Sequence, residues 1–244
     1  ILDVISKIED ETIAVIKAVE GDTVLHARLQ GIGYLSPEDA RMMCVVGPTA
    51  RGSGMAIDAR VDHPYAAYDE LVPDKKVHDG CDIWARTLVR LEETLDSIRL
   101  VREGIKGLQE MPEGDLVIPI DEEVPEGLEG ICVVEAPRGE CIHYVMTSAD
   151  NRPWRWRVRA PSYMNIHATP VMFQNVNGSS VGEPFINANL ADIPIIIGSV
   201  DPCFSCTERV EVIDTNSKQV RIYTHKELVE LCRRKTDELR AKLT

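Results

Sequence analysis

Apolar side chains recur every three or four positions across residues 79–109, and this pattern constrains the fold more than any other in the chain. Such spacing places side chains on one face of an α-helix, so it predicts a single long helix packed in a bundle. We expect charged residues such as Arg90, Glu93 and Arg102 on its outer, solvated face. The apolar positions are Trp84, Leu88, Leu91, Leu95, Ile98, Val101, Ile105 and Leu108.

Other segments predict more helices and a small antiparallel sheet. Residues 36–39, Ser-Pro-Glu-Asp, place an N-cap serine before a proline, which is typical of a helix start. Residues 130–158 predict paired strands around a turn at 148–151. The fold class that follows is α+β, mostly helical. Residues 1–19 also predict a helix, with an apolar face at Leu2, Ile5, Ile8, Thr12, Val15 and Val19.

The end of the chain predicts a separate small element. Residues 210–223 read as a hairpin, and residues 224–227, Thr-His-Lys-Glu, form a capping box that opens a last helix. We therefore expect one domain over residues 1–209 and a hairpin-plus-helix extension over residues 210–244.

The charge of the chain excludes some partners. A net charge of −13 over 244 residues argues against general binding to nucleic acids or anionic membranes. Residues 152–159 are the local exception, because arginines alternate there with apolar residues. An RNA-stacking strip is one reading. The favoured reading is a strand with its apolar side chains inward and its arginines facing solvent or an acidic partner.

Hydropathy and cysteine usage bear on the compartment. The longest apolar run, residues 193–200, is far shorter than the roughly 20 residues that cross a bilayer, so no transmembrane segment is expected. Seven cysteines, an odd number without a secretory signal, indicate a reducing cytoplasm.

Residues 201–206 read Asp-Pro-Cys-Phe-Ser-Cys and form a candidate half-site for a metal. Thiolates two residues apart can face one centre, and sulfur ligands suit nickel, copper(I), zinc or iron. A thioredoxin-like redox pair and chance are the other readings. Because the apolar run at 193–200 leads into the pair, we expect Cys203 and Cys206 in a dry interior, where a bound cation would compensate their charge.

This run resembles the second cysteine motif of the large subunit of [NiFe] hydrogenases. The resemblance implies that Cys203 is a terminal nickel ligand, and a candidate base, while Cys206 bridges nickel and an iron that carries carbonyl and cyanide ligands. It also implies the fold of that subunit, a helical bundle with a small antiparallel sheet.

Two more segments carry the same resemblance. Residues 135–140, Glu-Ala-Pro-Arg-Gly-Glu, match a family stretch that holds a guanidinium over the open coordination site, so Arg138 is the candidate, with Pro137 beside it. Arginine suits this place because it stays protonated and cannot be a ligand. Residues 160–165 match Val-Pro-Ser-x-x-Asn, which makes Ser162 a candidate donor to cyanide. The resemblance further implies that Asp201 orients Arg138, with its carboxylate matching the guanidinium fork. The other reading of Asp201 is a helix or turn cap before proline. His143 is a candidate donor in the surrounding layer, and its other reading is a structural residue.

Residues 46–54 indicate the branch of the family. Their Gly-Pro-Thr-Ala-Arg-Gly-Ser-Gly run resembles membrane-associated, energy-converting hydrogenases, relatives of the quinone-site subunit of complex I. A phosphate-binding loop is disfavoured because no lysine is present. Many soluble relatives carry a histidine where this chain has Arg209. We therefore expect an uncut tail without the magnesium site of those enzymes.

One departure from the family is large. The first Cys-x-x-Cys motif of the family is absent, so we expect this chain to be the C-terminal part of a longer subunit and inactive alone. The implied complete protein is a peripheral catalytic subunit on the cytoplasmic side of the membrane, which oxidises H2 and reduces protons reversibly. Its implied partners are an iron-sulfur small subunit, ion-translocating membrane subunits and ferredoxin. A metal-free coupling or quinone-site subunit of the complex I kind, and a zinc-binding structural domain, are the alternatives.

Overall fold

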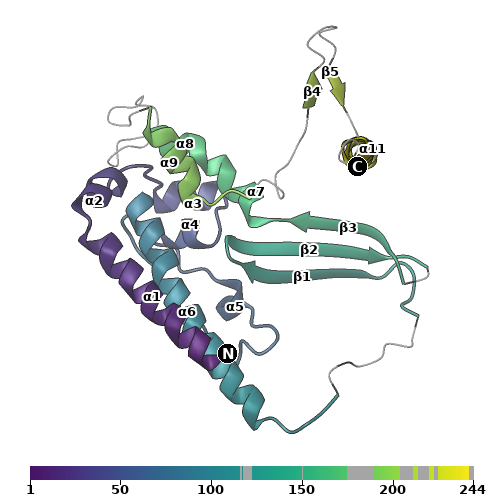
Figure 1. Cartoon of the computed structure of the whole chain (residues 1–244), viewed down its shortest axis with the longest axis horizontal. Helices are drawn as coiled ribbons and strands as arrows, with labels where there is room; N and C mark the ends of the chain where they lie inside the picture. The colour runs from purple at the N-terminus through teal and green to yellow at the C-terminus, as the bar shows by residue number, and fades with distance from the viewer. Residues whose placement is uncertain are drawn as a thin grey trace. The chain divides into compact units, whose positions relative to one another are not determined.

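The computed structural model describes residues 1–115, 117, 123–149, 151–174, 190–203, 211–213, 220–222 and 225–241 (Figure 1). The chain divides into two compact units, Ile1–Cys203 and Phe204–Thr244. The first unit combines helices with a three-stranded antiparallel sheet, so the predicted α+β, mostly helical class is confirmed. None of the helices in these ranges is both long and apolar enough to cross a membrane.

Helices form most of the first unit, and several begin at the caps expected from the sequence. Ser36 accepts a hydrogen bond from Asp39 N, and Asp82 accepts one from Ala85 N at the start of the long helix. The helices are α1 (Leu2–Gly21), α2 (Thr23–Leu29), α3 (Pro37–Met42), α4 (Pro48–Arg51), α5 (Ala59–Asp62), α6 (Ile83–Glu110), α7 (Pro161–Asn165), α8 (Thr169–Gln174) and α9 (Asp192–Ser199), with a 3₁₀ turn at Ile166–Ala168.

Helix α6 confirms the predicted long helix but not its predicted orientation. Its most buried residues are Ile83, Ala85, Arg86, Val89, Asp96, Ile98 and Leu100. Leu108, expected in the core stripe, is 70% exposed. Glu93, expected in solvent, is a nearly buried side chain that pairs with Arg51. The prediction was wrong here because charged residues on α6 find buried partners of opposite charge.

Helix α1 lies along α6 (Figure 1), and Glu9 forms an ion pair with Arg102 across the contact. The predicted apolar face of α1 is only partly correct, since Leu2, Ile5 and Val19 are half-buried while Ile8 and Val15 are exposed. The face of α1 that meets α6 is therefore rotated from the predicted one.

The sheet has the order β1-β2-β3, with β1 (Glu129–Ala136), β2 (Gly139–Thr147) and β3 (Pro153–Arg159). The two-residue turn between β1 and β2 is Pro137-Arg138. On β3, Trp154 and Trp156 are 71% and 60% exposed, and Arg155 and Arg157 are exposed as well. The expectation that the apolar side chains of this strand point into the core is therefore wrong.

A compact core lies where α3, α4, α8, α9 and the start of α6 meet. Its members are Leu35, Ala40, Val45, Ala50, Ile83, Ala168, Val171, Met172, Ile196 and Val200. Burying a side chain such as Ile196 or Val200 contributes about 1.5–3 kcal/mol. Ile196 lies within α9 and Val200 directly follows it, so the core anchors the segment from which residues 201–203 extend.

The second unit contains the predicted hairpin and helix. Strands β4 (Glu211–Ile213) and β5 (Val220–Ile222) pair antiparallel, and α11 spans His225–Ala241. The predicted boundary between residues 209 and 210, and Thr224 of the capping box, lie outside the described residues, so both stay predictions.

Candidate functional site

Arg138 and Asp201 are in direct contact at the turn between β1 and β2. Arg138 Nε donates to the Asp201 main-chain oxygen at 2.7 Å, and Nη2 donates to Asp201 Oδ1 at 3.1 Å. The contact expected from the sequence is present, but with a different geometry. The guanidinium donates to one carboxylate oxygen and to one main-chain carbonyl rather than to both carboxylate oxygens. It therefore fixes the backbone at residue 201 and also compensates the charge of the Asp201 side chain.

The glycine-rich loop at residues 46–54 packs against the Arg138 turn. Gly47 has a φ of 65°, and a Cβ added to it would lie 2.4 Å from the Arg138 main-chain oxygen. A Cβ on Gly139, whose φ is 125°, would lie 2.6 Å from Gly47 N. Only glycine permits this approach, because the backbones themselves are in contact. The loop therefore supports the Arg138 turn.

Asn165 joins the same two segments. Its Nδ2 donates to the Arg138 main-chain oxygen at 3.1 Å, and its Oδ1 accepts from Val46 N at 2.9 Å. The side chain is fully buried. In the sequence, Asn165 belongs to the 160–165 motif but was assigned no role. An asparagine in that motif could have indicated one, because an amide side chain carries both a donor and an acceptor and can bridge two main-chain groups.

Ser162 holds the backbone of Cys203. The Ser162 hydroxyl is fully buried and accepts a hydrogen bond from Cys203 N at 3.0 Å. The hydroxyl hydrogen remains available for donation to another acceptor. Cys203 itself is half-buried, so the expectation of a dry interior is wrong at this residue. Cys206 lies outside the described residues, and its placement stays a prediction.

The remaining predicted residues take different places. Pro137 lines a cavity together with Asp201. His143 lies on β2, where its Nδ1 accepts from Trp156 Nε1 at 3.2 Å and its Nε2 lies 3.5 Å from Cys141 Sγ. Both contacts hold the ring within the sheet, and they assign the ring hydrogen to Nε2. The role of His143 as a donor around the metal stays a prediction.

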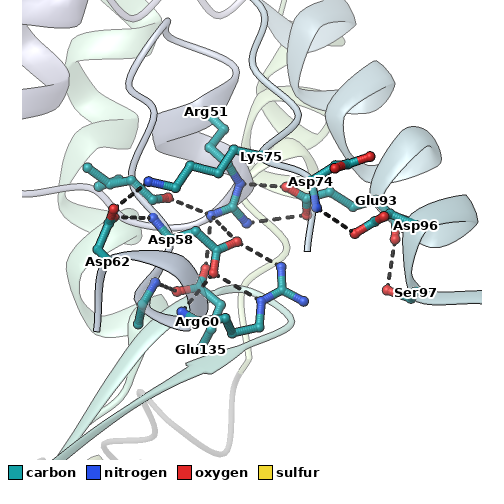
Figure 2. A network of polar contacts seen from close by, with 12 residues as sticks. Arg51, Asp58, Arg60, Asp62, Asp74, Lys75, Glu93, Asp96, Ser97 and Glu135 are labelled. Atoms are coloured by element: carbon teal, nitrogen blue, oxygen red, sulfur yellow. Dashed lines mark hydrogen bonds and ion pairs between the residues drawn. The ribbon is translucent and has the colours of Figure 1, made fainter. Parts of the chain in front are cut away.

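A buried ion network adjoins the Arg138 turn (Figure 2). Arg51, from the glycine-rich loop, is 1% exposed and donates through Nε to Glu93 Oε1 at 2.5 Å. Its Nη1 donates to Glu135 Oε1 at 3.0 Å and lies 3.5 Å from Asp58 Oδ2. A buried guanidinium needs such compensation, since desolvation of an unpaired charge is costly. Sequence reasoning missed this network because its members lie far apart along the chain.

Opposing effects set the pKa values in this network. Burial would raise the pKa of Asp58, but hydrogen bonds from Arg60 and the charge of Arg51 outweigh it and hold the pKa below its usual 3.8. Burial raises the pKa of Glu135 above its usual value; the charge of Arg51 opposes this shift and that of Asp58 adds to it. The pKa values of two carboxyl groups beside the same arginine are thus shifted in opposite directions.

The possible metal ligands among the described residues are His, Cys, Asp and Glu side chains. In that part of the chain, no three of these side chains gather in a way that could hold a metal ion. Cys203 is the candidate ligand within these ranges, and the sequence adds Cys206. Thiolates suit nickel and iron by their softness.

Comparison with known proteins assigns the family. The family described as "Respiratory-chain NADH dehydrogenase, 49 Kd subunit" matches residues 1–126 and 116–209. The carbon monoxide-induced hydrogenase of Rhodospirillum rubrum is 41% identical over 182 residues, which cover 75% of this chain and 46% of that protein. An NADH-quinone oxidoreductase subunit of Sinorhizobium medicae (strain WSM419) is 33% identical over 214 residues, covering 76% of this chain and 49% of that protein.

A solved structure agrees with these relatives. A chain of the membrane-bound sulfane sulfur reductase, an archaeal respiratory membrane complex, matches with a TM-score of 0.72 and 28% identity, covering 85% of this chain and 54% of that one. The fold and the site thus define a subunit of the oxidoreductases that include hydrogenases and complex I. The chain belongs to the family of the 49 kDa subunit of respiratory-chain NADH dehydrogenase. The family resemblance seen in the motifs is confirmed, and the chain spans about half the length of the two relatives above.

Proposed function

We propose that this chain is part of the catalytic subunit of an energy-converting [NiFe] hydrogenase, which oxidises H2 and reduces protons reversibly. One observation carries the proposal. The segment that bears Cys203 is held by Ser162 at its backbone and by Arg138 at Asp201, two residues earlier. Described residues from three segments that resemble hydrogenase motifs thus lie close together: Arg138 contacts Asp201, and Ser162 contacts Cys203.

In this proposal Cys203 and Cys206 would supply two thiolates to a centre of nickel and of iron with carbonyl and cyanide ligands. When bound, the centre would supply the two-electron chemistry of H2. Arg138 would provide a cation near these cysteines, and its bonds to Asp201 restrict its side chain to one orientation. Ser162 keeps a hydroxyl hydrogen that can be donated to cyanide. The remaining two thiolates would come from the other part of the complete subunit.

The proposed setting is a membrane complex in which this subunit is peripheral, on the cytoplasmic side. Its partners would be an iron-sulfur small subunit that takes the electrons, ion-translocating membrane subunits and ferredoxin. The resemblance to membrane-bound hydrogenases and to an archaeal respiratory membrane complex supports this arrangement.

A metal-free coupling subunit of the complex I kind is the second candidate. The similarity to the NADH-quinone oxidoreductase subunit favours it, because that similarity extends over 76% of this chain. The two candidates differ in what they require of the cysteines. A coupling subunit needs no thiolate at position 203, whereas a hydrogenase needs one.

Replacement of single cysteines in the native complex distinguishes them. Cys203→Ser is expected to abolish H2-dependent electron transfer and to lower the nickel content. Cys232→Ser is the matched control, since Cys232 is an exposed cysteine of the second unit and should leave both unchanged. Full activity and an unchanged metal content in the Cys203→Ser complex would refute the hydrogenase function.

A further inference from the structure

Glu135 forms part of the wall of two separate cavities. One, the Asp201 cavity, has a volume of about 360 Å³ and is lined by Asp201, Pro137 and Glu135 among others. The other, the His63 cavity, has a volume of about 390 Å³ and is lined by His63, Asp62 and Glu135 among others. Cavities of this size that have polar groups in their walls can hold water. Glu135 therefore lines two spaces that water can occupy.

The two cavities lead in different directions. The Asp201 cavity reaches Pro137 and Asp201, which adjoin Arg138 and Cys203. The His63 cavity is lined by the exposed residues Asp62 and His63, so this side faces solvent. Glu135 is the carboxylate common to both, and its side chain is only 4% exposed.

The contacts of Glu135 hold its two oxygens in different surroundings (Figure 2). Oε1 accepts from Arg51 Nη1 at 3.0 Å, and Oε2 accepts from Ala59 N at 3.1 Å, while the main-chain nitrogen of Glu135 donates to Tyr65 Oη at 3.0 Å. Each oxygen retains lone pairs for a proton. The charged and titratable groups that face it from the surrounding elements are Arg51, Asp58, Arg60, Tyr65, Arg90, Glu93 and Glu140.

Glu93 provides a close comparison. It pairs with the same guanidinium, through Arg51 Nε at 2.5 Å and Nη2 at 3.3 Å, and it lines the Asp201 cavity. It does not line the His63 cavity. Glu93 and Glu135 thus both compensate the charge of Arg51, but only Glu135 lines the His63 cavity.

We propose that Glu135 carries protons between the Asp201 cavity and the His63 cavity. This inference rests on the proposed function, because oxidation of H2 releases protons that must leave the protein. A water in the Asp201 cavity takes up a proton released by H2 oxidation and becomes hydronium. An O–H bond of this hydronium breaks, which leaves water, as an O–H bond forms on the Glu135 carboxylate. Glu135 then gives its proton to a water in the His63 cavity, the resulting hydronium releases the proton to solvent, and the carboxylate is restored. Burial, which raises the pKa of Glu135, makes its protonated form easier to reach.

Isotope exchange in the native complex tests this role. Conversion of para-H2 to ortho-H2 requires H2 cleavage at the centre, whereas formation of HD from D2 in ordinary water also requires proton exchange with solvent. In Glu135→Gln, which keeps the shape but not the basic oxygen, we expect HD formation to fall about 100-fold or more, with spin conversion and nickel content unchanged. HD formation at the wild-type rate would overturn the proposal.

Glu93→Gln is the matched control, and HD formation is expected to stay near the wild-type rate in it. An equal loss in both variants would show that the effect comes from Arg51 and would overturn the relay. If Glu135→Gln does not assemble, Glu135→Asp keeps the charge but withdraws the oxygens, and HD formation should slow about tenfold or more. An unchanged rate in Glu135→Asp would count against the relay. A wild-type complex without spin conversion would instead refute the proposed function itself.

Discussion

Gly47 and Gly139 are in main-chain contact, so that a Cβ on Gly47 would lie 2.4 Å from Gly139 Cα. This contact joins the glycine-rich loop to the turn that carries Arg138. The glycine-rich loop at residues 46–54 thus supports the turn that carries one arginine. The position of Arg138 thus depends on a segment almost ninety residues earlier in the chain.

Gly47→Ala should destabilise the fold strongly. A methyl group would overlap backbone atoms that cannot rotate away, and the positive φ adds strain, so we expect a loss of more than about 3 kcal/mol. The free energy of unfolding in urea measures this. Gly54→Ala is the matched control, because Gly54 has a φ of 78° but open space where a Cβ would lie. It should cost only about 1 kcal/mol. Equal losses in the two variants would show that the close contact is not the cause.

Asn165→Leu should both destabilise the fold and displace Arg138. The change leaves Val46 N and the Arg138 carbonyl without their partner, at a cost of about 1–3 kcal/mol for each group. Urea unfolding measures the loss, and Gln174→Leu on the exposed end of α8 serves as the control. A stability equal to the wild type would contradict the bridging role of Asn165.

Asp58→Asn should lower stability at neutral pH and much less in acid. The pKa of Asp58 is lowered in the folded protein, so its stabilising contribution is complete above the unfolded value of 3.8 and is lost as the pH falls through the folded pKa. We expect a loss of about 1–3 kcal/mol at pH 7, and a difference from the wild type that shrinks below pH 3.8.

Urea unfolding at several pH values measures that difference. Asp74→Asn is the control, because the Asp74 side chain is 66% exposed and its pair with Lys76 is weak. A difference between wild type and Asp58→Asn that stays constant from pH 7 to pH 3 would contradict the assigned shift.

Arg138→Lys tests the catalytic part of the account. Lysine keeps the charge but cannot bond both the main-chain and side-chain oxygens of Asp201 with one planar group. We expect H2 turnover in the native complex to fall about 100-fold with the nickel content unchanged. Arg155→Lys on the exposed strand β3 is the control and should retain activity. Wild-type turnover in Arg138→Lys would remove this residue from the mechanism.

Periodicity and caps predicted much of the fold. The long helix α6, the start of α3 at Ser36, the antiparallel strands around the turn at 148–151 and the tail hairpin follow from local spacing and turn chemistry, which do not depend on distant residues. The turn at Pro137-Arg138, which separates β1 from β2, was expected only as a break within one strand. The face that each helix turns toward the core was harder to predict. Glu93 was assigned to solvent because charged residues usually lie there, and only its pairing with Arg51 explains its burial.

The candidate site was predicted in part. Motifs identified Arg138, Asp201, Ser162 and Cys203, and the structure brings these four into one region. Local patterns gave no means to find the supporting contacts. Asn165, Gly47 and Glu135 act through partners that are close only in the folded chain.

The proposed function places a nickel-iron centre at residues around Arg138 and Cys203. Anoxic metal analysis combined with infrared spectroscopy, on the full-length subunit in its native complex, detects such a centre. We expect nickel and iron together with carbonyl and cyanide stretching bands, all of them diminished in the Cys203→Ser complex. Nickel, iron and these bands absent from an intact, mature wild-type complex would contradict the proposed function.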